Sequence, residues 1–233
     1  MDAPYLYTFE HPTTVVLAGP TKCGKTQFLV RALRENRFQP NPERIVWVFG
    51  EWQPAYEELA RDMPCIQFVK GFSPELYQSF DARVRNMLIL DDQMENKAAK
   101  RRGQDSVVKF FTQGSHHRNL TVVYIVQNMY NKDEVMRTVS LNTHYMILFK
   151  NWRDQSQITT LARQMFGEKF RFLEEAFKHA TQVPYGHMVI DCRPNGDDRL
   201  RVLSQVFDDP TAYVPREDAY NMYQKMRGHA EDN

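Results

Sequence analysis

Eight residues, from 19 to 26, fit the pattern G-x-x-x-x-G-K-[ST] and separate an apolar run at 14–18 from a segment with helical periodicity. A strand, a glycine-containing loop and a helix in this order wrap backbone N–H groups around a polyphosphate. The two glycines let the backbone approach phosphate oxygens closely. The pattern therefore predicts a nucleotide site. The residues expected to contact the nucleotide are Gly19, Pro20, Thr21, Lys22, Cys23, Gly24, Lys25 and Thr26.

Two side chains at the end of this loop have specific predicted tasks. Lys25 is expected to reach the β- and γ-phosphates of ATP, and the Thr26 hydroxyl is expected to ligate Mg²⁺. The helix that begins here adds its positive dipole end and its N–H donors.

The composition limits the other classes of function. The chain has 233 residues and a formal net charge of +1, so any contact with nucleic acid has to come from a local patch. Three cysteines without metal-ligand spacing argue against a disulfide framework. No run is apolar for long enough to span a bilayer, and the amino terminus does not fit a signal peptide. We expect a soluble, intracellular protein without a membrane partner.

Short apolar segments alternate with helical ones along the chain, which predicts an α/β fold with a central, mostly parallel sheet flanked by helices. We expect one domain over residues 1–215, followed by a short helix and tail at 216–233. The expected helices are 25–35, 54–61, 74–84, 105–116, 154–165 and 168–180. The expected strands are 14–18, 44–49, 65–69, 86–90, 120–126, 144–149, 186–191 and 199–206.

The apolar strand at 86–90 leads directly into two carboxylates, Asp91 and Asp92. A phosphate loop needs an acid to hold magnesium, and Asp91 at the end of a buried strand is the candidate. Asp92 can accept a hydrogen bond from water and orient it toward the γ-phosphate. Two acids that only cap the following turn are the alternative.

The strand at 120–126 ends in Gln127, whose amide can sense the γ-phosphate or help to place the water. A turn residue is the simpler interpretation. The strands at 44–49 and 65–69 separate the loop strand from the acid strand in sequence, unlike the order in simple nucleotide kinases and GTPases. We therefore expect a P-loop NTPase of the additional-strand (ASCE/RecA-like) type.

Two other clusters have less specific interpretations. His116 and His117 have no nearby histidine or cysteine, so hydrogen bonding at a helix end is favoured over metal ligation. The basic run at 97–102 fits a loop that grips DNA phosphates without reading sequence, or equally a solvated loop.

Taken together, these motifs resemble the small viral DNA-packaging ATPases of the poxvirus and Polinton/Maverick type, within the FtsK–HerA superfamily. The resemblance spans roughly residues 11 to 166, with a weaker echo at 185–201. The matching pieces are His11-Pro12, 19–26, 88–92, 114–119, 126–128, Arg137 with 140–142, 149–154 and 161–164. The blocks around Ser115-His116-His117, Gln127-Asn128 and Arg153-Asp154 are more specific than the phosphate loop alone.

The resemblance implies a homo-oligomeric ring that hydrolyses ATP to drive double-stranded DNA, without sequence specificity, into a capsid through a capsid or portal protein. It implies a magnesium role for Asp91, a water-activating role for Asp92 and a sensor role for Gln127. Many members of the superfamily have glutamate at the water-activating position, so Asp92 is a departure, and Glu95 is a second candidate.

Ring ATPases of this kind also place an arginine of one subunit at the γ-phosphate bound by the next. Arg118 is the favoured candidate, since it precedes the strand that carries Gln127, and Arg153 is the second. Arg137 and the pair Arg101-Arg102 are further candidates, and each of these arginines also fits an ordinary surface charge.

Two other functions remain open at this point. A small-molecule or nucleotide kinase shares the phosphate loop, but its acid strand runs next to the loop strand. A nucleotide-dependent scaffold that hydrolyses weakly is compatible with aspartate at position 92.

Overall fold

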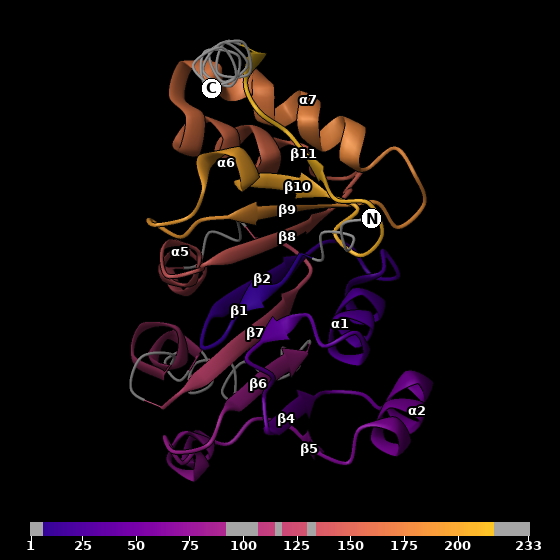
Figure 1. The fold of residues 1–233 in the computed structure, drawn as a ribbon, viewed down its shortest axis with the longest axis vertical. Helices are drawn as coiled ribbons and strands as arrows, with labels where there is room; N and C mark the ends of the chain where they lie inside the picture. The colour runs from indigo at the N-terminus through magenta and orange to yellow at the C-terminus, as the bar shows by residue number, and fades with distance from the viewer. Residues whose placement is uncertain (1–6, 92–106, 115–117, 130–133, 217–233) are drawn as a thin grey trace, which may run out of the picture.

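The computed structural model describes residues 7–91, 107–114, 118–129 and 134–216. Its centre is a nine-stranded sheet with the strand order β11-β10-β9-β8-β2-β7-β6-β4-β5 (Figure 1). The strands of this sheet are β2 (Thr14–Ala18), β4 (Arg44–Phe49), β5 (Ile66–Lys70), β6 (Asn86–Asp91), β7 (Leu120–Val126), β8 (Tyr145–Phe149), β9 (His187–Asp191), β10 (Val202–Ser204) and β11 (Thr211–Ala212). Two short strands, β1 (Phe9–Glu10) and β3 (Phe38–Gln39), pair separately in parallel.

Most of the sheet is parallel. Five parallel pairings join the six strands from β8 to β5, whereas β9, β10 and β11 continue the sheet in antiparallel pairs. We call the side where the six parallel strands begin the amino end of the sheet, and the side where they finish the carboxyl end. The predicted α/β class and mostly parallel sheet are confirmed.

Helices cover both faces of the sheet because alternate side chains of each buried strand point to opposite faces. Val15 and Leu17 share a core with α1 (Lys25–Arg34) and α2 (Pro54–Asp62). Val16 packs with helices on the other face. These are the π-helical turn η2 (Phe110–Gly114), α5 (Glu134–Leu141), α6 (Ser156–Phe166) and α7 (Phe170–Ala180).

The order of the central strands decides the type of P-loop fold. β7 pairs with both β2 and β6, so it separates the loop strand from the acid strand. The strands that separate these motifs in sequence, β4 and β5, lie beyond β6. This insertion of a strand confirms the predicted additional-strand type, and it differs from the adjacency expected of a kinase.

Some local elements differ from the prediction. A helix was expected over 74–84, but only the 3₁₀ turn η1 (Pro74–Ser79) forms. The Asp81 carboxylate accepts the backbone N–H of Arg83 at 2.9 Å, and this local bond competes with helix. The strand expected over 199–206 begins instead with the 3₁₀ turn η4 (Asp198–Leu200), and the helix expected from 168 begins with η3 (Gly167–Lys169).

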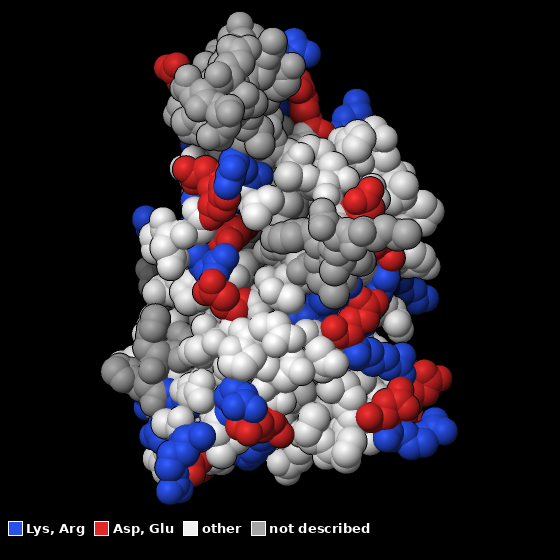
Figure 2. All heavy atoms as spheres, viewed as in Figure 1, with Lys and Arg blue, Asp and Glu red and all other residues white. Residues whose placement is uncertain are grey.

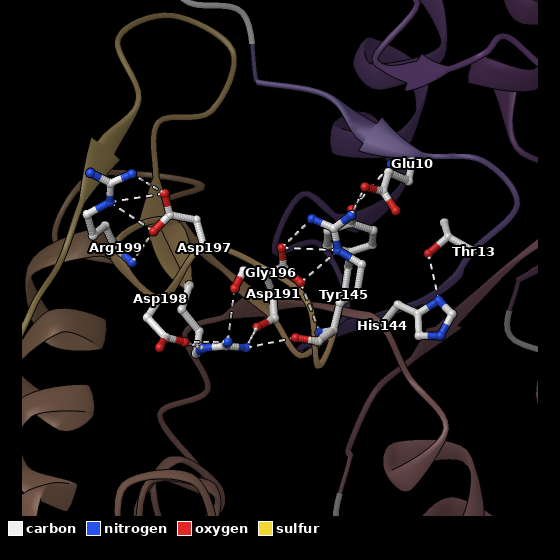
Figure 3. A network of polar contacts seen from close by, with 11 residues as sticks. Glu10, Thr13, His144, Tyr145, Asp191, Gly196, Asp197, Asp198 and Arg199 are labelled. Carbon is white, nitrogen blue, oxygen red and sulfur yellow. Dashed lines mark hydrogen bonds and ion pairs between the residues drawn. The ribbon is translucent and has the colours of Figure 1, made fainter.

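A network of ion pairs fastens the amino end of the sheet (Figure 3). The Arg193 guanidinium donates to both oxygens of the buried Asp191 carboxylate and pairs with Glu10. It also lies 4.9 Å from the ring centroid of Tyr145, whose hydroxyl accepts the backbone N–H of Glu10. The network therefore ties β1 to the β9–β10 hairpin.

Charges of both signs are interspersed over the described part of the face in Figure 2, in keeping with the balanced composition. Within the described residues, no helix has the length and apolar character needed to cross a membrane.

Candidate nucleotide site

The predicted phosphate loop connects β2 to α1 at the carboxyl end of the sheet. The N–H of Gly19 donates to the Val126 carbonyl at 3.2 Å, which extends the β2–β7 pairing into the loop. Gly24 caps α1 with φ 108°, a left-handed conformation that favours glycine. A Cβ at Gly19 would lie 2.7 Å from the Cβ of Phe149, so only glycine fits there. Both glycines of the motif therefore occupy positions where a side chain would clash or be strained.

Lys25 is the first residue of α1, and its ammonium points back into the loop. Nζ donates to the carbonyls of Gly19 at 2.5 Å and Pro20 at 2.8 Å. The first turn of α1 contains no acidic residue and no side-chain cap, so the positive end of the helix faces the loop unopposed. Burial raises the pKa of the Cys23 thiol, so that side chain adds no negative charge. The loop is therefore suited to an anion.

Asp91 ends β6 and lines the same cavity as Lys25 and Thr26. Its side chain is buried, and one carboxylate oxygen accepts a hydrogen bond of 2.7 Å from the hydroxyl of Tyr56. Tyr56 is fully buried on α2. A carboxylate and a hydroxyl facing one cavity are the oxygen ligands that Mg²⁺ prefers, so this donor set fits the predicted metal.

Gln127 follows β7, between the loop strand and the acid strand, and it also lines the cavity. The neighbouring Asn128 donates to the Asp154 carboxylate at 3.3 Å, and the N–H of Met129 donates to Gln157 at 3.1 Å. Ser156 donates to the same carboxylate, and its hydrogen bond lowers the pKa of Asp154. The segment carrying Gln127 is thus fixed to the start of α6.

The structure brings Gly24, Lys25, Thr26, Asp91 and Gln127 to one cavity of about 740 Å³. The turn over 183–186, the preceding end of α7 and the segment 205–208 form its other wall. Sequence reasoning missed this wall, apart from the weak echo that begins at residue 185. Its residues carry no motif, and only folding places them beside the phosphate loop.

Arg118 lies elsewhere. It precedes β7 at the amino end of the sheet, whereas the phosphate loop follows β2 at the carboxyl end. Its guanidinium donates to the Phe80 carbonyl at 3.2 Å and lies 5.2 Å from the Tyr77 ring centroid. The structure therefore does not bring Arg118 to the loop of its own chain, and its role toward a neighbouring subunit stays a prediction.

Arg153 is exposed in the segment after β8, at the same end of the sheet as the phosphate loop. Arg137 is exposed on α5. The following predicted residues lie outside the described ones: Asp92, Glu95, Arg101, Arg102, the rest of the basic run 97–102, Ser115, His116 and His117. Within the described ranges, no group of three or more His, Cys, Asp and Glu residues is placed to hold a metal ion.

Comparison with known proteins places this geometry in a known fold. The DNA-packaging ATPase B204 of Sulfolobus turreted icosahedral virus aligns with a TM-score of 0.51 and 12% identity, over 87% of this chain and 97% of B204. The genome-packaging NTPase B204 of Sulfolobus turreted icosahedral virus 2, in complex with ATPγS, aligns with a TM-score of 0.50 and 15% identity over the same shares. This chain has the fold of a genome-packaging NTPase.

The same fold occurs in other P-loop ATPases. The cytoplasmic domain of the type VII secretion ATPase EccC of Thermomonospora curvata aligns with a TM-score of 0.50 and 12% identity, over 77% of this chain and 24% of EccC. No protein-family model matches the chain, and no curated protein matches its sequence. The expected P-loop ATPase fold is confirmed by the likeness to these solved structures.

Proposed function

We propose that this protein hydrolyses ATP and uses the energy to move double-stranded DNA, as a ring of identical subunits, into a capsid. One observation carries the ATPase part of the proposal. Lys25 of the phosphate loop and Asp91 at the end of β6 line a single cavity, although β7 separates their strands. The likeness of fold to a viral genome-packaging NTPase supports the packaging part.

The residues around the cavity have complementary tasks in this proposal. Lys25 and the N–H groups at the start of α1 bind the phosphates and offset negative charge that develops during transfer. Thr26 and Asp91 would hold Mg²⁺, which supplies neutralisation of charge on the β- and γ-phosphates. Gln127 would orient the attacking water, with Asp92 accepting its proton.

The proposal also includes a contribution in trans. Arg118 is our first candidate for the arginine that reaches the nucleotide of an adjacent subunit, with Arg153 as the alternative. Arg153 lies at the carboxyl end of the sheet, as the phosphate loop does, whereas Arg118 needs a neighbour whose phosphate loop faces the amino end. Arginine suits the task because its planar fork matches phosphate oxygens.

The central test is phosphate release measured without an acceptor, in the presence and absence of linear duplex DNA. We expect hydrolysis that duplex DNA stimulates, and Lys25→Ala should lower its rate by about 100-fold or more. Lys178→Ala, at an exposed position on α7, is the matched control and should keep the parental rate. An acceptor-dependent reaction that ignores DNA would indicate a kinase instead, and packaging that survives Lys25→Ala would indicate a scaffold.

DNA contact is tested separately through the basic run, with Lys100, Arg101 and Arg102 replaced together by alanine. Loss of phosphate contacts should weaken duplex binding and DNA-stimulated hydrolysis while nucleotide binding stays at the parental level. Duplex binding that is unchanged at low salt would exclude this run as the contact.

A further inference from the structure

The candidate cavity is larger than its phosphate-binding part, and the additional wall has a different chemistry. Lys25, Thr26 and Asp91 line one side, and the proposed function assigns phosphates and metal to them. The other side is formed by two turns, 183–186 and 205–208, which contribute Val183, Pro184, Tyr185 and Phe207. Apolar and aromatic side chains of this kind are unsuited to phosphate oxygens but suited to a flat organic group.

Tyr185 is the most unusual residue of this wall. Its backbone is left-handed with φ 60°, a rare conformation for an aromatic residue, and its side chain is 71% exposed. The ring nevertheless lies against the phosphate loop, since a Cβ at Gly24 would be 3.2 Å from its Cδ1. The N–H of Gly186 donates to the Val183 carbonyl at 3.0 Å and closes the turn. The turn thus holds an exposed ring beside the start of α1 at some conformational cost.

The second turn is fastened to α1 at a fixed position. The Arg31 guanidinium donates to both carboxylate oxygens of Asp208, at 2.7 and 3.2 Å, and lies 4.7 Å from the Phe207 ring centroid. The hydrogen bonds from Arg31 lower the pKa of Asp208, which keeps the carboxylate charged. Phe207 in turn packs on Phe28 of α1, with ring centroids 4.8 Å apart. A rigid apolar floor with a polar rim results.

His187 completes this floor between the two turns. Its ring centroid lies 4.7 Å from that of Phe28, and burial lowers its pKa, so the imidazole is neutral near pH 7. His187 therefore adds an uncharged aromatic ring to the wall. Gln205, with φ 53°, and Asp208 supply polar groups at the rim.

We infer that these two turns form the nucleoside pocket, in which Tyr185 stacks on the purine base of a nucleoside triphosphate. The inference rests on the proposed function, because the pocket continues directly from the phosphate loop. Stacking on an aromatic side chain is tolerant of base identity, so the polar rim is the part that can distinguish one base from another.

The test separates base recognition from phosphate recognition by using two probes, ATP and inorganic tripolyphosphate. Tyr185→Asn removes the ring, and asparagine tolerates a left-handed backbone. We expect this variant to bind ATP about 5- to 150-fold more weakly, the range that corresponds to one lost base stack. Its affinity for tripolyphosphate should equal that of the parent. Tyr185→Phe keeps the ring and should keep the parental affinity for both probes.

Trp152→Ala is the matched control, because Trp152 is 74% exposed and does not line the cavity. An equal loss of ATP and tripolyphosphate binding in Tyr185→Asn would overturn this inference alone, since the ring would then only support the loop. Parental ATP affinity in Tyr185→Asn would overturn it as well. A parent protein that binds neither probe would instead overturn the proposed function, and the nucleoside pocket with it.

Discussion

At the amino end of the sheet, Arg193 is paired with both Asp191 and Glu10. At the carboxyl end, Lys25 at the start of α1 and Asp91 at the end of β6 face a shared cavity. A buried charge that is paired with an opposite charge fixes how the two segments that carry these groups pack. Charged groups that converge on a cavity can serve a ligand instead. We therefore expect variants at the amino end to change the free energy of unfolding, and variants at the carboxyl end to change the binding of ligand and Mg²⁺.

The largest expected effect at the amino end comes from Arg193→Ala. The substitution leaves the Asp191 carboxylate, which is 4% exposed, without its guanidinium partner. The free energy of unfolding should fall by about 3 kcal/mol, as measured by urea denaturation. Nucleotide affinity should stay at the parental value under conditions in which the variant is folded. A large loss of nucleotide affinity in the fully folded variant would contradict the expectation that the two ends have separate roles.

Tyr56→Phe gives the corresponding test at the carboxyl end. It removes the hydrogen bond that orients Asp91, while the buried ring remains in place. In the proposed function Asp91 holds Mg²⁺. Loss of a partner that orients a metal ligand typically costs about 10- to 100-fold in metal affinity, so half-maximal hydrolysis should require that much more Mg²⁺. Tyr77→Phe is the control, since the Tyr77 ring packs on Phe110 away from the cavity. An unchanged Mg²⁺ requirement in Tyr56→Phe would show that Asp91 does not depend on this contact.

Glu10→Gln tests how much the ion pair between Glu10 and Arg193 contributes to stability at the amino end. The Glu10 side chain is 64% exposed, so its ion pair with Arg193 is screened by solvent. The free energy of unfolding should change by less than about 1 kcal/mol. A loss as large as that of Arg193→Ala would mean that Glu10, rather than Asp191, is the important partner.

The smallest expected effect concerns His187 and pH. Burial lowers the pKa of His187 in the folded protein below its ordinary value of 6.5, so the unfolded chain binds more protons as the pH falls below 6.5. Stability should therefore decrease in this range, and His187→Phe should reduce the decrease. Nε2 has no hydrogen-bond partner among the described residues, and the substitution removes the 3.4 Å contact between Nδ1 and the Tyr185 carbonyl. Urea denaturation at pH 7.5 and 5.5 measures the difference, and an equal decrease in both proteins would exclude His187 as its source.

The sequence predicted the middle strands of the sheet closely because they are almost entirely buried. β2, β4 and β7 match their predicted bounds, as expected for continuous apolar runs that are covered on both faces. The prediction was wrong for most of 74–84, where the Asp81–Arg83 turn competes with helix. It also missed α5 and the two-residue strands β1, β3 and β11, since two residues are too few for an alternating pattern.

For the site, the motif and the strand end were sufficient to predict that Lys25, Thr26, Asp91 and Gln127 belong together, and all four line one cavity. The hydrogen bond from Tyr56 to Asp91 could not be predicted, because a tyrosine on an amphipathic helix has no local signal for a partner on a distant strand. The same holds for the wall formed by the turns at 183–186 and 205–208.

The sequence alone determined the phosphate loop, since glycine, lysine and threonine at fixed spacing are a local requirement of backbone geometry. The tertiary structure decided that β7 separates β2 from β6, and that an aromatic wall stands beside the start of α1. Strand order and cavity walls depend on how helices cross over the sheet. That choice is made by packing between distant segments, which leaves no pattern in either segment by itself.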